Sequence, residues 1–254
     1  GVSPSTAAWN NVCGLIALLC ISVTFVATSS QASPRFVRRE WRGRSLLARV
    51  RGELVYALRD ANVRANAIIS VVVSTLVVVA TLTLPREAHQ TIFPLVATIV
   101  AALALVAPRM LRGVFPRVDP PQRVLGLSAI SWTLSLSSVV IFLVGAFSLP
   151  AMFLFVAHPE AVSGWLLLAT ISLAAAVAVL AGVLFPVGPN NALGQGLASG
   201  GALCGYLIAA VLLENSLPKS AGSQALLGAL ALGAAVAAAV AIESTRWAPR
   251  VTSA

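Results

Sequence analysis

The sequence has little charge, since only 10% of its 254 residues are Asp, Glu, Lys or Arg and aromatic residues make up 6%. Soluble domains are about one-quarter charged. Apolar residues instead make up 58%, and the mean hydropathy is +0.92. This composition excludes an ordinary water-soluble enzyme. At about 20 residues per membrane span, the apolar residues suffice for about seven spans.

Seven apolar stretches have the length of a spanning helix, and none contains Asp, Glu, Lys, Arg or His. Each can satisfy its backbone hydrogen bonds internally, as a bilayer requires. We therefore expect an all-α, polytopic integral membrane helical bundle with about seven transmembrane helices. The predicted spans are residues 12–29, 66–84, 92–107, 124–147, 165–185, 196–213 and 223–242.

Negative charge is also scarce, because the chain has eight acidic and seventeen basic residues. Lys219 is the only lysine, and the other basic residues are arginines. Fifteen of the basic residues lie in 35–64, 109–123 and the C-terminal tail. Basic residues gather in cytoplasmic loops, so these segments predict a cytoplasmic C-terminus and an outside N-terminus. The net charge of +9 then belongs to a membrane protein's cytoplasmic face, and no nucleic-acid partner is expected. Arginine in place of lysine, with abundant Ala and Val, suggests a GC-rich bacterium and its cytoplasmic membrane.

The longest polar segment, 35–65, has a helical periodicity of its own. Its apolar residues Leu47, Val50, Leu54, Leu58 and Ala61 recur every three or four positions, and Arg and Glu residues cover the remaining surface. This predicts an amphipathic cytoplasmic elbow helix that leads into the second span. Anionic lipid headgroups would hold such a helix; contact with a cytoplasmic partner is an equally open and compatible interpretation.

The organisation that follows has four parts. Residues 1–34 hold the outside N-terminus and the first span, and 35–65 the amphipathic helix. A six-helix transmembrane unit covers 66–250, and 251–254 form a cytoplasmic tail. The first residue is Gly rather than Met, which suggests a trimmed start, a segment of a longer product or a cleaved signal peptide.

Several catalytic and transport mechanisms lack the residues that they require. No Gly-x4-Gly-Lys-Ser/Thr loop is present, so the chain has no nucleotide site of the Walker kind, and ATP is expected only on a partner subunit. No serine-histidine arrangement fits an intramembrane protease, and the two histidines are isolated in loops. We expect no catalytic residue, cofactor or metal. Carriers driven by protons or sodium usually place carboxylates inside the bundle, which disfavours that class here.

Small and hydroxyl residues form stripes within the predicted spans. Such stripes allow close helix approach and interhelical hydrogen bonds, and they can also line a weakly polar substrate path. Both interpretations stay open. The glycines of the sixth span, at 196, 200, 201 and 205, predict tight packing, including against a second subunit. The serines that are candidates for helix packing or for a substrate path are Ser70, Ser74, Ser128, Ser131, Ser135 and Ser138.

A basic amphipathic helix with the core Glu53-Leu54 and Arg59-Asp60 precedes a six-span unit whose ends are both cytoplasmic. A second basic loop, 108–117, follows two helices later, and Phe185-Pro186 precedes the fifth helix of the unit. This organisation, over about 35–250, resembles the permease subunit of ABC exporters that use a separate ATPase. The extra first span suggests the C-terminal half of a longer permease. By resemblance, the residues that couple to the ATPase are Arg49, Glu53, Arg59, Asp60, Arg109, Arg112 and Arg117.

The resemblance implies alternating access in a dimer or pseudo-dimer that moves a hydrophobic or amphipathic substrate. Its expected partners are membrane lipid and an ATP-binding subunit. Two alternatives belong to other classes: a non-catalytic membrane scaffold or assembly subunit of a larger complex, and a secondary transporter.

Overall fold

The computed structural model describes residues 46–59, 61–106, 129–158, 163–185, 192–216 and 221–247. These residues form eight helices and no strand, which confirms the all-α class. The helices are α3 (Leu46–Arg59), α4 (Ala61–Leu82), α5 (Arg86–Ala104), α9 (Ala129–Phe147), α10 (Leu149–Ala157), α11 (Gly164–Leu184), α12 (Ala192–Ser216) and α13 (Ala221–Trp247).

Four of these helices are long and apolar enough to cross a membrane: Val63–Leu82, Ile130–Phe147, Gly164–Leu184 and Gly222–Thr245. Two apolar stretches, Thr91–Ala104 and Gly196–Leu212, are shorter. The four long helices indicate a membrane protein. They do not confirm seven spans, and that count stays a prediction. The predicted first span, 12–29, lies outside the described residues.

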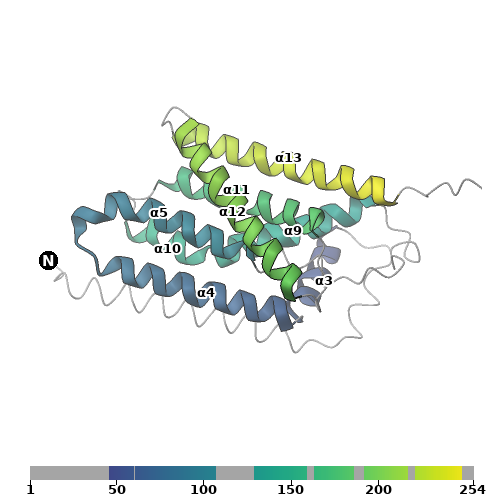
Figure 1. Ribbon diagram of the computed structural model, residues 1–254, viewed down its shortest axis with the longest axis horizontal. Coiled ribbons are helices and arrows are strands. Elements are labelled where there is room, and N and C mark those ends of the chain that lie inside the picture. The colour runs from purple at the N-terminus through teal and green to yellow at the C-terminus, as the bar shows by residue number, and fades with distance from the viewer. Residues whose placement is uncertain are drawn as a thin grey trace, which may run out of the picture.

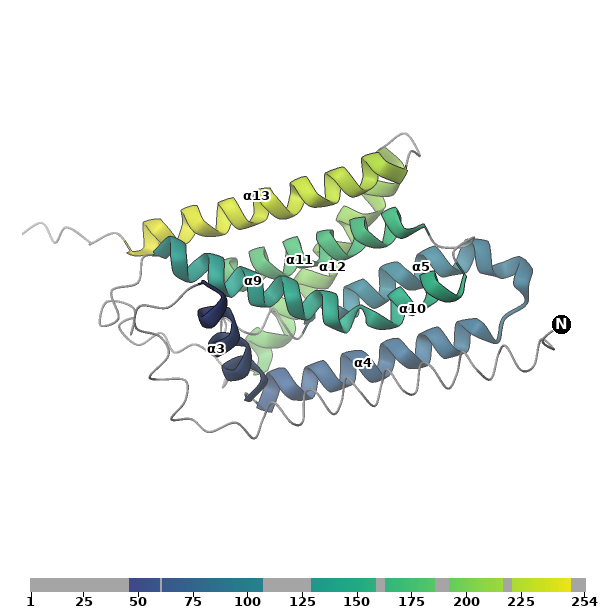
Figure 2. The same ribbon diagram turned by 180° about the vertical axis from the view of Figure 1, so that it is seen from behind.

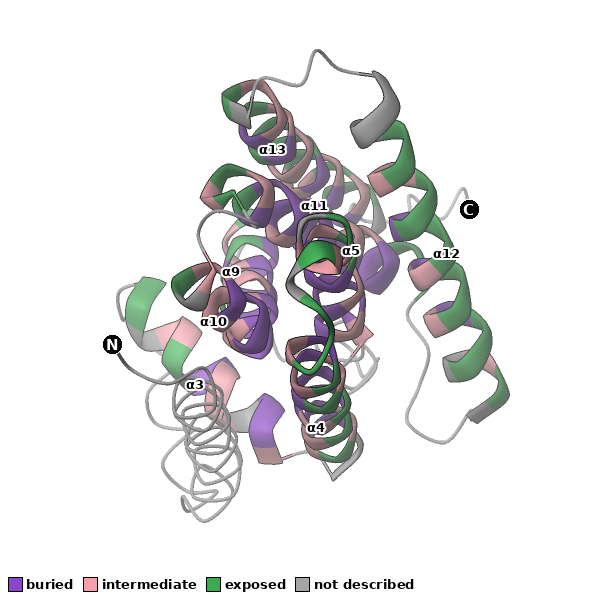
Figure 3. Ribbon diagram, turned by 90° about the vertical axis from the view of Figure 1, so that its left-hand side faces the viewer, coloured by how far each residue is buried: buried purple, intermediate pink, exposed green. Residues whose placement is uncertain are grey.

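Helix α11 lies at the centre of the bundle, where it packs against α13, α9, α12 and α5 (Figure 3). The long helices run roughly alongside one another, α12 crosses them diagonally, and α3 lies at one end (Figures 1 and 2). The C-terminal end of α13 is at the same end as α3, and the α4–α5 turn is at the opposite end. Helix α3 therefore sits where the bundle meets one face of the predicted membrane.

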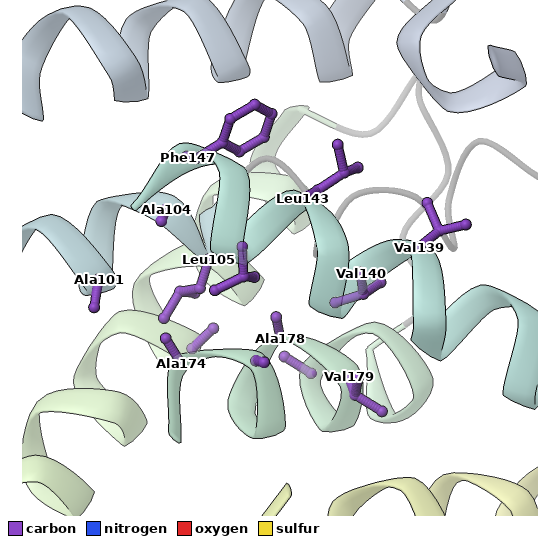
Figure 4. Packing of buried hydrophobic residues seen from close by; sticks show 14 of the residues in the cluster. Ala101, Ala104, Leu105, Val139, Val140, Leu143, Phe147, Ala174, Ala178 and Val179 are labelled. Atoms are coloured by element: carbon purple, nitrogen blue, oxygen red, sulfur yellow. The ribbon is translucent and has the colours of Figure 1, made fainter. Parts of the chain in front are cut away.

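The larger core cluster combines small side chains with branched ones. Figure 4 shows Val140 of α9 pointing toward Ala178 of α11, with Ala174 and Leu105 nearby, whereas Leu143 points to the other side of α9. In a bilayer, helix association depends on van der Waals contact and hydrogen bonds, because lipid tails are as apolar as the side chains. Alanine allows the backbones to approach closely, which explains why an alanine-rich helix holds the central position.

The connection between the predicted fourth and fifth spans contains a helix, α10, that the sequence did not predict. Helix α9 ends at Phe147, and the chain becomes helical again at Leu149. Pro150 has no amide hydrogen to continue the ladder, and the hydroxyl of Ser148 donates to Val144 O at 2.8 Å. The nine residues of α10 are apolar and pack against α4 and α5, so they extend the bundle.

The expectation that the glycines of the sixth span pack tightly is wrong within this chain. A Cβ at Gly196, Gly200, Gly201 or Gly205 would meet nothing within 4 Å. Helix α12 packs mainly on α11 and leaves most of its surface exposed. The close approach instead involves α13, where a Cβ on Gly228 would lie 2.9 Å from both Cα and O of Ala169 on α11.

Candidate functional site

A polar contact joins the amphipathic helix α3 to the spanning helix α9. Arg49, on α3, donates from Nη1 to the hydroxyl of Ser131 on α9. One turn further along α3, Glu53 lies beside Ser135, one turn further along α9. Two pairs of residues at i and i+4 thus face each other. We call Arg49, Glu53, Ser131 and Ser135 the α3–α9 contact.

Glu53 is only 2% exposed, although the sequence predicts it on the surface of the amphipathic helix. The prediction was wrong because periodicity separates polar from apolar faces but does not show which neighbour covers a polar face. Burial raises the pKa of Glu53 from 4.5 to about 7, against the opposite effects of Ser135 and then Arg49. The Ser135 hydroxyl falls short of hydrogen-bond geometry, since Glu53 Oε2 and Ser135 Oγ both lack a partner.

The remaining coupling candidates fall into two groups. Arg59, at the end of α3, is half-buried, and its Nε and Nη2 atoms are buried without a hydrogen-bond partner. The others lie outside the described residues: Asp60, Arg109, Arg112 and Arg117. The structure therefore brings Arg49 and Glu53 together and places Arg59 on the same helix.

The two serine stripes have different surroundings. On α4, Ser70 and Ser74 are buried inside the bundle, and Ser74 Oγ has no hydrogen-bond partner. On α9, Ser131 and Ser135 contact α3, whereas Ser138 donates to Leu134 O, one turn back on its own helix, at 2.8 Å. Ser128 lies outside the described residues. Ser131 and Ser135 thus belong to the α3–α9 contact, and a role of the α4 serines in a substrate path stays a prediction.

A second carboxylate is buried where sequence reasoning placed none. Glu243 on α13 is 1% exposed and lies within the apolar stretch Gly222–Thr245. The predicted span stopped one residue earlier, at 242, because a glutamate normally ends an apolar run. The predicted span, 223–242, contains no ionisable side chain, and the structure adds Glu243 just beyond its end.

The two histidines are not isolated, in contrast to the prediction. The rings of His89 and His158 lie 5.4 Å apart between centroids, and both contact the buried ring of Phe93, at 4.3 Å and 5.1 Å. His89 Nε2 is also 2.9 Å from Leu84 O. The two histidines are 69 positions apart in the sequence, so no local pattern could have shown their contact. The described residues contain no group of three or more potential metal ligands.

With this geometry established, the chain was compared with known protein families, curated proteins and solved structures. No match was found.

Proposed function

We propose that the chain is the membrane-spanning permease subunit of an ATP-driven exporter, in which α3 passes the movement of a partner ATPase into the helix bundle. The partner would hold the ATP. The bundle would move a hydrophobic or amphipathic substrate by alternating access, as a dimer or pseudo-dimer.

The observation that carries this proposal is the attachment of α3 to two parts of the bundle at once. Only residue 60 separates α3 from α4, whose apolar stretch begins at Val63. The α3–α9 contact ties the same short helix to α9. A force applied to α3 would therefore act on two spanning helices together, as a coupling helix requires.

Helix α3 also has a surface on which a partner could act. Leu46, Leu47 and Arg51 are exposed, and Leu47 is 81% exposed although it belongs to the predicted apolar stripe. An exposed leucine beside an arginine suits either a lipid surface or a protein that covers it. The ATPase is the occupant that the proposal requires.

The interior of α4 supports a weakly polar path. Ser70, Ser74, Thr75 and Thr81 are all buried on this helix. The threonine hydroxyls donate to carbonyls one turn back, Thr75 to Val71 O at 2.8 Å and Thr81 to Val77 O at 2.6 Å. Hydroxyls satisfied in this way present a mildly polar surface without charge, which suits an amphipathic substrate better than an ion.

Co-purification tests the proposal, with a matched pair of variants. Leu47→Glu places a carboxylate on the exposed face of α3, and Thr245→Glu places one at an exposed position near the end of α13. We expect ATP hydrolysis to co-elute with the wild type and Thr245→Glu in mild detergent and to be lost with Leu47→Glu. An ATPase absent from all three samples, or retained equally by both variants, contradicts the proposal.

The orientation belongs to the same proposal and is tested separately. It places α3 on the cytoplasmic side of a bacterial membrane and the α4–α5 turn outside. In a cysteine-free background, a membrane-impermeant maleimide should label Thr83→Cys in whole spheroplasts and Leu47→Cys only in inside-out vesicles. The reverse pattern would show that the basic segments do not face the cytoplasm.

A secondary transporter is the second candidate, and the buried carboxylates of Glu53 and Glu243 favour it. Ionisable groups inside a bundle are costly and commonly mark ion pathways. Substrate export that continues without ATP, driven by a pH gradient, would distinguish this candidate from an ATP-driven exporter.

A further inference from the structure

Glu53 has surroundings that suit a neutral acid better than a carboxylate. It lies on α3, ahead of the first described span, yet it is almost completely buried. Arg49 donates to Ser131, and Glu53 Oε2 has no hydrogen-bond partner. A buried carboxylate oxygen without a donor is disfavoured in its charged form away from water. The site therefore favours a form of Glu53 in which that oxygen is not charged.

The two helices on which α3 mainly packs carry no acidic residue within their described ranges. Helix α3 packs against α9 and α4. Helix α9 has no ionisable residue, and α4 has only Arg64, which is half-buried. The other charged residues of α3 are Arg49, Arg51 and Arg59. These cations favour an ionised Glu53, so burial alone opposes ionisation, and burial has the larger effect on the pKa.

One added proton would satisfy two atoms. Glu53 Oε2 and Ser135 Oγ both lack a hydrogen-bond partner, and Ser135 lies beside the carboxylate. A proton bound to Oε2 makes that oxygen a donor, and a serine hydroxyl oxygen can accept. The neutral acid could then donate to Ser135 and close the α3–α9 contact.

We propose that Glu53 is a proton-binding site, which takes up a proton from water at Oε2, and that the protonated form holds α3 against α9. This inference goes beyond the proposed function and does not depend on it, because it requires neither an ATPase nor a transported substrate.

The direction of the pH effect follows from the two states of α3. In the docked state the pKa of Glu53 is about 7, and in an undocked, solvated state it would return to about 4.5. The docked state therefore binds the proton more tightly. The stabilisation of the docked state by protonation of Glu53 is therefore complete below pH 4.5, and it is lost as the pH rises through 7. The two pKa values differ by about 2.5 units, which corresponds to a change of roughly 300-fold in the docking equilibrium.

Infrared difference spectroscopy of the whole protein in detergent tests the proposal, because a protonated carboxyl group has a C=O stretch that a carboxylate lacks. We expect this band to appear as the pH is lowered through about 7. It should be missing from Glu53→Gln and retained by Glu243→Gln, the control at the other buried glutamate. A band that is absent near neutral pH in the wild type, or that Glu53→Gln retains, overturns the proposal.

A second variant keeps the test valid if Glu53→Gln does not fold. In the proposed state Ser135 accepts from the protonated Oε2, so Ser135→Ala should move the midpoint of the band to lower pH. A shift to higher pH would show that Ser135 instead donates to the carboxylate. Backbone hydrogen exchange of α3 should also become faster in the wild type between pH 5 and 8, after correction for the intrinsic rate. An unchanged midpoint, or protection of α3 that does not depend on pH, contradicts the proposal.

Discussion

The contact between Gly228 and Ala169 makes a sharp prediction about stability. A Cβ at position 228 would lie 2.9 Å from the Ala169 Cα and O atoms. Both are backbone atoms of α11, so no side-chain rotation can relieve the overlap. Gly228→Ala should therefore force α13 away from α11, which is its most extensive helix partner among the described helices.

The size of the effect follows from two opposing terms. Alanine favours a helix over glycine by about 1 kcal/mol, and overpacking of a close contact costs about 1–3 kcal/mol. Gly233 lies on the same helix, and a Cβ there would meet nothing within 4 Å. Gly233→Ala thus measures the first term alone. We expect Gly228→Ala to be about 1–3 kcal/mol less stable than Gly233→Ala.

Thermal unfolding of both variants in one detergent provides the assay. For a chain of this length, 1 kcal/mol corresponds to roughly 2–4 °C in melting temperature. Gly228→Ala should melt several degrees below Gly233→Ala, and Gly228→Val lower still. If Gly228→Ala melts at or above Gly233→Ala, then α11 and α13 are not in backbone contact and the reasoning fails.

The same assay checks two further predictions. Phe93→Ala should cost about 3–5 kcal/mol, because this ring is fully buried between two histidine rings; Leu95→Ala, at an exposed position of the same helix, should be nearly neutral, and equal costs would contradict the packing. Ser131→Ala should cost about 1–3 kcal/mol, because it leaves an Arg49 donor without its acceptor. Ser138→Ala should cost much less, since Ser138 bonds only its own helix; a reversed order would show that Arg49 does not bind α9.

The position of a helix could be predicted well where a long apolar stretch is bounded by residues that end helices. The predicted span 165–185 corresponds to α11, Gly164–Leu184, with Ser163 as N-cap through its hydroxyl, which accepts from Trp165 N at 3.3 Å. Helix α10 was missed because its nine residues are too few for a span. What stabilises it is packing on α4 and α5, a tertiary effect that local periodicity does not contain.

The candidate site could be predicted only as a set of residue types. Sequence reasoning selected Arg49, Glu53, Ser131 and Ser135 but assigned them to two separate functions. Their meeting depends on how α3 lies across α9 (Figure 2). Arg49 and Ser131 are 82 positions apart in the sequence, and no local pattern shows that they meet. The same holds for the glycines: a small residue permits a close helix contact, but the sequence does not show which helix will make that contact.

The backbone contact at Gly228 also determines which parts of the bundle can separate. Helices whose backbones touch cannot slide past each other without first parting, so we expect α11 and α13 to move as one rigid body. Among the described helices, α12 packs mainly on α11 and α5 and has exposed glycines on its surface, so its displacement breaks few contacts. If the bundle opens toward the two sides of the membrane in turn, α12 is the helix that swings, and the α11–α13 pair is the frame against which it moves.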